Sequence, residues 1–430
     1  MSLKDLIGNT LPGPNRLTDG MDRILDMTRT VATGLTTIDG AMSTALLAQR
    51  LGQYPAVDNA DARSTQYGKA LNAFELLCNL NLRDREIARR IMTHDDFSAL
   101  KADFPCVFSA MSHWVAGDLP TARRWWVSHL AQFPADIVTS FMLHMFDFLH
   151  GHPDRYGDYL QNDARCDDPV HGGFYQGILA FSLCEQGRYR EALPLAQAAQ
   201  HKNPDDIYGL HALIHAWHGT GDHPAIVEYL QRSSTWQANP GMNIHVHWHL
   251  AVSLLQTGQV KPSILAYRGF RSLTAGHHAE QDLDAVNYCI RLYCSQLSRP
   301  AFTAEYAQLA RNWAPSIYNS LSYFNDLHAA FAFMLAGDHA LLEKLRTRPP
   351  LWGLDDELQR TGQQLIAALA AFADEDYGAC VANLQGSRAH WYRIGGSRAQ
   401  REVLDILLQT ASRFAAGSTP PLHPPVTALN

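Results

Sequence analysis

The segment EQGRYREAL, residues 185–193, places a glycine turn between an apolar stretch and an amphipathic one, and this arrangement recurs along the chain. The related turns are VAGDLPTA at 115–122, LHGHPDRY at 149–156, GTGDHPAIV at 219–227 and QTGQVKPSI at 256–264. Their glycines, from Gly117 to Gly258, are separated by 34, 36, 34 and 37 residues. Further turns are expected near Ser298, at Gly337 and near Glu375. A small residue at such a turn lets the first helix end in a left-handed cap, so the pattern predicts helical hairpins repeated at a fixed period.

The period itself is typical of one class of repeat. A helix-turn-helix unit of about 34 residues resembles the tetratricopeptide repeat, and Gly187, Tyr189, Ala192 and Pro204 match that repeat best. Such units cannot bury their apolar faces alone, so they stack on their neighbours. The resemblance implies that the first helix of each hairpin lines a concave inner surface. We therefore expect an all-α fold with tetratricopeptide-like helical-hairpin repeats stacked into a superhelix.

The repeats are not expected to cover the whole chain. Residues 1–20 are punctuated by glycine and proline and are predicted to form an extended N-terminal arm. Residues 21–92 have helical apolar spacing and are predicted to form an N-terminal helical region. The repeat array is expected at 93–416, followed by a flexible tail at 417–430. No role is assigned to the first 70 or so residues.

Composition excludes several classes of protein. Hydrophobic residues make up 46% of the 430 residues and charged residues 18%, so the chain can bury a large core. The net charge of −7 and the scattered basic residues argue against nucleic-acid binding. No stretch has the apolar length of a transmembrane helix, and the N-terminus lacks the apolar core of a signal peptide. The seven cysteines have no zinc-ribbon spacing and are interpreted as reduced, mostly buried thiols. We expect a soluble, cytoplasmic protein.

Two pairs of histidines are the strongest candidates for chemistry. His211 and His215 lie in IYGLHALIHAWHG, and His245 and His249 lie in GMNIHVHWHLAVSLL. Each pair is spaced i, i+4, which places both imidazoles on one face of a helix. Because the chain has 21 histidines, about one such pair is expected by chance. The spacing alone is therefore weak support for a site.

Position within the repeat is more informative than spacing. The four paired histidines, together with His144 and His328, precede a repeat turn by 6 to 13 residues and so fall on first helices. Neighbouring helices pack 8–10 Å apart, so imidazoles from two first helices can converge on one ion. Neutral imidazole suits zinc, iron or copper. We predict these metal ligands: His211, His215, His245 and His249.

Other residues are predicted to support that site. We expect His144, His328 and Asp326 to act as catalytic acid or base groups. Asp326 or Asp147 is expected to supply an oxygen ligand or to orient a ring. Two alternatives stay open, namely a polar pocket without a metal and plain packing of the histidines inside the groove.

A second, more specific resemblance comes from the C-terminal part. The chain contains WYRIGGSRAQREVLDILL at 391–408 and FNDLHAAFAF at 324–333, and with the two histidine segments these resemble the tetratricopeptide repeat protein 38 family. The similarity covers about residues 80–410. It implies an α-helical repeat fold and places the six histidines named above at family histidine positions. It implies little about activity. Within the motif, Ser397 is interpreted as a helix cap in preference to an anion-binding residue.

Two functions are compatible with these observations. The first is a His-lined concave pocket that binds a small molecule, with a metal ion, and converts it in a specialised pathway. The second is a non-catalytic scaffold that binds a peptide or partner protein in its groove. The small number of Lys and Arg residues on the first helices favours the pocket. A homodimer is left open.

Overall fold

The computed structural model describes the residues that carry the repeats. These are 66–98, 101, 104–134, 136–152, 164–167, 172–204, 206–233, 235–238, 242–273, 282–295 and 302–417. The predicted arm at 1–20, most of the predicted helical region at 21–92 and nearly all of the predicted tail lie outside them, as does the turn predicted near Ser298. Within the described ranges the chain is helical almost throughout, and its only β pairing is an isolated bridge between Asn81 and Ser320. The predicted all-α fold of tetratricopeptide-like helical hairpins is confirmed.

The helices belong to two compact units, and the chain passes from one to the other at residues 79–83 and within α15. The first unit comprises the described parts of Met1–Asn79 and Arg83–Ala266, and the second comprises those of Leu80–Leu82 and Tyr267–Asn430. The helices of the first unit are α4 (Gln66–Cys78), α5 (Leu82–His94), α7 (Pro105–Ala116), α8 (Leu119–Gln132), α9 (Ile137–Leu149), α10 (Gly172–Glu185), α11 (Tyr189–Lys202), α12 (Ile207–Thr220), α13 (His223–Arg232), α14 (Asn243–Gln256) and most of α15 (Val260–Leu273), with short 3₁₀ segments η3 (Ala164–Asp167) and η4 (Thr235–Ala238).

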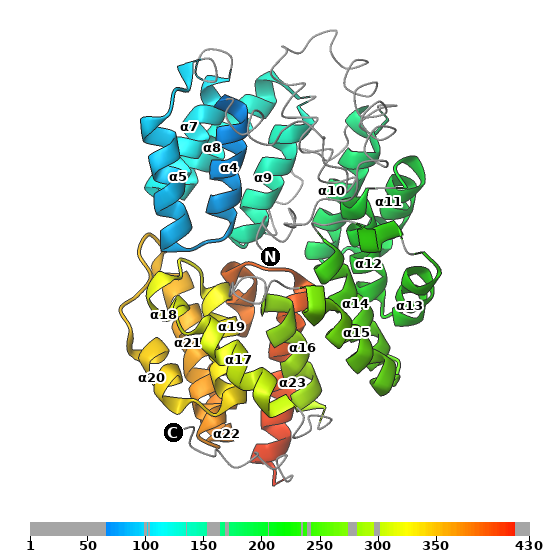
Figure 1. Cartoon of the computed structure of the whole chain (residues 1–430), viewed down its shortest axis with the longest axis vertical. Helices are drawn as coiled ribbons and strands as arrows, with labels where there is room; N and C mark the ends of the chain where they lie inside the picture. Colours follow the sequence, from blue (N-terminus) through cyan, green and yellow to red (C-terminus); the bar gives the residue numbers. More distant parts are fainter. Residues whose placement is uncertain are drawn as a thin grey trace. The chain divides into compact units, whose positions relative to one another are not determined.

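The hairpins of the first unit are held by a repeated pair of end signals. Gly117 ends α7 and Gly221 ends α12, with φ values of 84° and 77°, a left-handed conformation that disfavours any residue with a Cβ. An aspartate follows each glycine, and its side chain accepts a backbone N–H of the next helix, as Asp222 does from Ala225. Helices α10, α11 and α12 pack on one another, and α13 packs on α12 and α14. Figure 1 shows these helices side by side in green.

The first helices of these hairpins are almost completely buried. Every residue of α9 is buried, as is every residue of α10 except Leu179. Residues 207–216 of α12 are also buried, whereas the second helices α11 and α13 each keep an exposed face. A polar side chain on a first helix is therefore removed from water and needs a partner.

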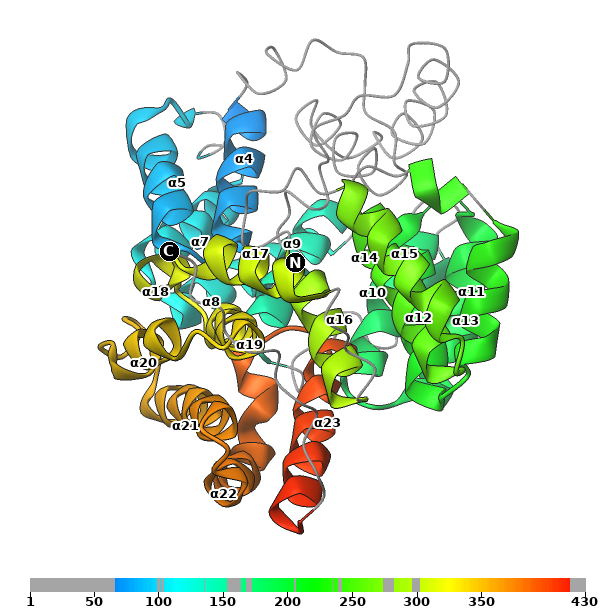
Figure 2. The ribbon, with the colours of Figure 1, turned by 60° about the horizontal axis from the view of Figure 1, so that its bottom comes forward.

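The second unit is built from the C-terminal helices. They are α16 (Leu283–Cys294), α17 (Thr303–Trp313), α18 (Ser316–Asn319), α19 (Tyr323–Ala336), α20 (His339–Thr347), α21 (Asp356–Ala373), α22 (Tyr377–Ser387), the 3₁₀ segment η7 (Arg388–Ile394) and α23 (Arg398–Ala415). Helix α19 packs on α16, α17 and α21, and α23 packs on α16 and α22. Figure 2 shows α21 and α22 as neighbours, in orange. The predicted turns at Gly337 and Glu375 are present, with φ values of 68° and 60°.

The Gly-Gly-Ser motif is part of this framework. Ser397 and Gln400 form a capping box at the start of α23, which agrees with the predicted cap. Gly396 has φ +73°, and a Cβ there would lie 2.1 Å from the ring of Phe324. The Arg401 guanidinium donates to the Gly395 carbonyl at 3.0 Å. The motif therefore has a structural role: it starts α23 and packs the beginning of this helix against Phe324 of α19.

Two expectations from composition can be compared with the structure. None of the seven cysteines is in a disulfide, and all but Cys166 are buried, which agrees with the interpretation of the sequence. Among the residues that the structure describes, no helix is both long enough and apolar enough to cross a membrane.

Candidate metal centre

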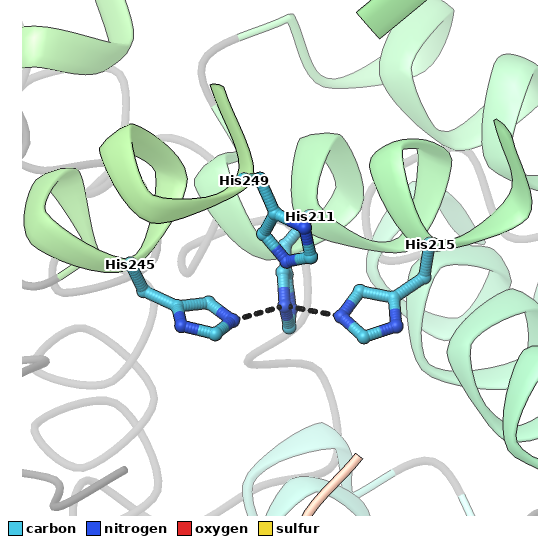
Figure 3. Close-up of side chains that lie close together, drawn as sticks. All are labelled: His211, His215, His245 and His249. Carbon is cyan, nitrogen blue, oxygen red and sulfur yellow. Dashed lines mark hydrogen bonds between the residues drawn. The ribbon is translucent and has the colours of Figure 1, made fainter. Parts of the chain in front are cut away.

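The four histidines predicted as ligands come together inside the first unit. His211 and His215 project from α12, and His245 and His249 project from α14. Figure 3 shows their rings pointing toward one another between the two helices. Each histidine contributes one ring nitrogen to a group of four, and these four nitrogens all lie within 4.8 Å of one another. His245 follows His211 by 34 residues and His249 follows His215 by 34 (245 − 211 and 249 − 215), so each histidine of one pair has a counterpart in the other at an offset close to the repeat period.

The ends of α12 determine which way its histidines point. Asp206 precedes α12, and its carboxylate accepts the backbone N–H of Tyr208 at 3.1 Å. Gly221 ends the same helix in the left-handed conformation. The helix therefore begins and ends at positions specified by local sequence, and its 3.6-residue turn directs His211 and His215 to the same side.

The nitrogen positions are difficult to explain by hydrogen bonds alone. Nε2 of His211 lies 2.8 Å from Nε2 of His215 and 3.0 Å from Nε2 of His245. A neutral imidazole nitrogen carries either one proton or one lone pair, so it forms one good hydrogen bond at a time. Three such nitrogens at one point leave at least one contact unsatisfied. A cation that accepts a lone pair from each would satisfy all of them.

His249 strengthens this reading. Its ring is fully buried, 4.7 Å from the ring of His245 and 4.8 Å from that of His215, centroid to centroid. Neither of its ring nitrogens has a hydrogen-bond partner among the described residues. Buried polar atoms are nearly always satisfied in folded proteins, and an unpartnered nitrogen beside three others is available as a ligand for an ion.

Burial also keeps three of the four rings uncharged. Removal from water lowers the pKa of His211, His215 and His249 well below the usual value, and the charges of neighbouring histidines lower it further. Removal from water is the largest cause because a buried imidazolium loses its hydration. These rings therefore stay neutral at physiological pH, which is the protonation state that a metal ligand requires.

A carboxylate that the sequence analysis did not single out lies beside the cluster. Oε1 of Glu185 is 3.8 Å from Nδ1 of His215, and both side chains are buried. Glu185 is the last residue of α10. A negative charge at a helix C-terminus is unfavourable because it meets the negative end of the helix dipole. An acidic residue at the end of a first helix, one hairpin before the histidines, was the signal that could have revealed it.

Aromatic rings surround the four imidazoles. Trp248 stacks on His245 with centroids 5.2 Å apart and an interplanar angle of 16°. The ring of Phe181 lies 5.1 Å from His211 and 4.8 Å from His215. This apolar shell lowers the local dielectric and restricts the rings to few orientations, both of which favour a defined coordination geometry.

His144, predicted as an acid or base, lies near the cluster in the same unit. Its Nε2 is hydrogen-bonded to the hydroxyl of Tyr208, and Oγ of Ser182 lies 3.4 Å from its Nδ1. The Tyr208 ring is 5.8 Å from that of His211. Tyr208, which the sequence analysis did not select, thus connects His144 to the four-histidine cluster.

The other two residues predicted as catalytic belong to the second unit. Asp326 forms an ion pair with Arg348, and Nδ1 of His328 donates to the carbonyl of Phe324 at 2.8 Å. Burial raises the pKa of Asp326 to about 6, although Arg348 opposes that rise, and burial lowers the pKa of His328 to about 4. In the first unit, the carboxylate of Asp147 is occupied by Arg123, with Nε and Nη2 at 2.7 and 2.8 Å. Both aspartates considered as orienting groups are therefore paired with arginines.

The chemistry of the donor set defines the class of ion. Four imidazole nitrogens suit zinc, copper, nickel or iron, whereas magnesium and calcium prefer oxygen ligands. The chain is thus a helical-hairpin repeat protein with a buried four-histidine cluster that can hold a metal ion. No protein-family model matches it.

Proposed function

We propose that this protein binds one transition-metal ion through His211, His215, His245 and His249 and uses it on a small molecule. Zinc, iron and copper are the candidate ions. The observation that carries the proposal is the convergence of three Nε2 atoms at 2.8 and 3.0 Å, with the unpartnered nitrogens of His249 beside them. Hydrogen bonding between neutral imidazoles does not satisfy that arrangement, whereas coordination does.

The residues around the cluster have separate roles in this proposal. Glu185 offsets part of the positive charge of a bound ion and orients the ring of His215. Tyr208 and His144 share a proton between the Tyr208 hydroxyl and Nε2 of His144, and the ring of Tyr208 contacts that of His211. They form the acid–base pair of this proposal. A bound ion would polarise a carbonyl or lower the pKa of a water molecule. His328 and Asp326 stay predictions as catalytic groups.

Metal analysis of the purified full chain tests the proposal. The protein is prepared without an affinity tag from metal-replete medium, and its metal content and absorption spectrum are measured. We expect close to one equivalent of one transition metal in the wild type and a large loss in the double variant His215→Ala/His249→Ala. Protein without stoichiometric metal would overturn the proposal and leave the scaffold that binds a peptide as the better reading.

His247 provides a matched control on the same helix. It lies between two of the candidate ligands in sequence, but its Nδ1 is bonded to the Asn243 carbonyl at 2.7 Å and its ring contacts Trp236. The variant His247→Ala should therefore keep the metal. Loss of metal in this variant as well would indicate that any change in α14 disturbs the protein.

Two further assignments are part of the proposal. The seven mostly buried cysteines, none of them in a disulfide, support the cytoplasm as the compartment. The histidine segments and the Gly-Gly-Ser motif support a relationship to the tetratricopeptide repeat protein 38 family.

A further inference from the structure

Two more histidines lie between the four-histidine cluster and the end of its hairpin. His218 is on α12, one turn beyond His215, and its ring centroid is 6.2 Å from that of His249. His223 is the first residue of α13, and its ring is 4.9 Å from that of His218, nearly perpendicular to it at 80°. Both side chains are half-buried, and the turn between them at Gly221 and Asp222 is exposed.

This arrangement forms a row of imidazoles from an exposed turn to the buried cluster. The four cluster residues are at most 3% exposed, so an ion cannot reach them from water without passing other side chains. A buried metal site needs an entry path. His218 and His223 lie on the hairpin end beside the cluster, where the ring of His218 contacts that of His249 and Nδ1 of His223 lies 3.3 Å from Oγ of Ser253.

We propose that His218 and His223 form a second, transient metal site that passes a divalent transition-metal ion to the four-histidine cluster. The inference rests on the proposed function, because it needs the cluster to be the destination. Two imidazoles bind zinc weakly compared with four, since each coordinated nitrogen adds to the affinity. The ion is therefore captured at the turn and transferred inward by exchanging one imidazole ligand for another, with no change in oxidation state.

Kinetics separate this role from a structural one. A transfer site speeds entry and exit of the ion by the same factor, because both follow the same path, and leaves the equilibrium affinity of the final site unchanged. A residue that only supports the fold of the cluster changes the affinity itself. An ion held at the neighbouring site is present at a high effective concentration for the cluster. Removing that neighbouring site should therefore slow loading by about tenfold or more at micromolar metal.

The experiment uses the full chain, stripped of metal, in four forms: wild type, His218→Gln, His223→Gln and the control His247→Gln. Glutamine keeps polarity and approximate size but is a poor zinc ligand. Loading is followed by mixing with Co²⁺, whose absorption reports coordination, and with Zn²⁺; release is followed with a chelator in excess. We expect loading and release to slow by about the same factor in the first two variants, with final metal content and affinity equal to wild type.

Three results would overturn the inference. One is loading at wild-type rates in both variants, and another is a loss of affinity in place of a loss of rate. The third, a wild-type protein that takes up no metal at all, removes the proposed function together with the inference. If His218→Gln fails to fold, His223→Gln carries the test, because His223 is half-buried at the start of its helix.

Discussion

Replacing His249 by leucine should change the stability of the protein in opposite directions with and without metal. In the metal-free state the imidazole is fully buried, and neither nitrogen has a hydrogen-bond partner among the described residues. Burial of an unsatisfied polar group costs about 1–3 kcal/mol. Leucine has a similar volume and no polar atom, so we expect His249→Leu to stabilise the metal-free protein by about that amount.

With metal present the sign reverses. An ion that binds only the folded state stabilises it by about 2.7 kcal/mol when its free concentration is 100 times Kd. The wild type gains this stabilisation, and a variant that lacks one of four ligands loses most of it. The sign reverses because the metal stabilisation lost in the variant exceeds the roughly 1–3 kcal/mol gained by removing the unsatisfied polar group. The effect of His249→Leu on the free energy of unfolding should therefore differ by several kcal/mol between the stripped and the loaded protein.

The measurement is scanning calorimetry of stripped and zinc-loaded full-length chain, with His247→Leu as the control. For a unit of this size each kcal/mol shifts Tm by roughly 2–4 °C. We expect a higher Tm than wild type for stripped His249→Leu and almost no response of that variant to zinc. A stripped variant less stable than wild type would show that the His249 nitrogens are satisfied. An equal response of both proteins to zinc would show that His249 is not a ligand.

Three further predictions concern the second unit. Burial lowers the pKa of His328 to about 4, so between pH 6.5 and 4 the unfolded chain protonates this residue while the folded chain keeps it neutral. The free energy of unfolding should therefore decrease by about 3 kcal/mol as the pH falls through this range. Urea unfolding should show a flatter pH dependence for His328→Gln than for the wild type. Arg348→Met should destabilise by about 3–5 kcal/mol at pH 8, because it leaves buried Asp326 without its partner; since the Asp326 pKa is already about 6, the loss should be smaller at pH 5, and an equal loss at both pH values would contradict the reasoning. Gly396→Ala should cost about 2–5 kcal/mol from backbone strain and the close contact with Phe324, whereas Gly269→Ala, with open space around its Cβ position, should leave thermal unfolding nearly unchanged.

The features that the sequence predicted correctly are those with local causes. Gly117 and Gly221 end helices because a residue without a Cβ enters the left-handed conformation easily. Asp206 and Ser397 begin helices because their side chains accept backbone N–H groups a few residues away. The repeat phase then placed the four paired histidines on first helices, which are buried, and this was sufficient to predict that their imidazoles converge.

The partners that the sequence could not predict are distant along the chain. Tyr208 and His144 are 64 residues apart, and Asp147 and Arg123 are 24 apart. Whether an aspartate orients a histidine or pairs with an arginine depends on which side chain the neighbouring helix presents, and periodicity does not specify this. The sequence marks Glu185 as an acidic residue at the end of a first helix, but its closeness to His215 arises from packing of α10 on α12, which periodicity does not specify.

The equal 34-residue offset of the two histidine pairs has a consequence for how such a site originates. A single hairpin with histidines at i and i+4 of its first helix offers only two ligands. Tandem duplication of that hairpin supplies the other two at once with the same i, i+4 spacing, although His215 precedes Gly221 by 6 residues and His249 precedes Gly258 by 9, so the distance from the pair to its turn has changed by three residues. The centre would then be older as a pair than as a quartet, and a one-residue insertion between the two histidines of either pair would remove it, because the second imidazole would move about 100° around its own helix, away from the first.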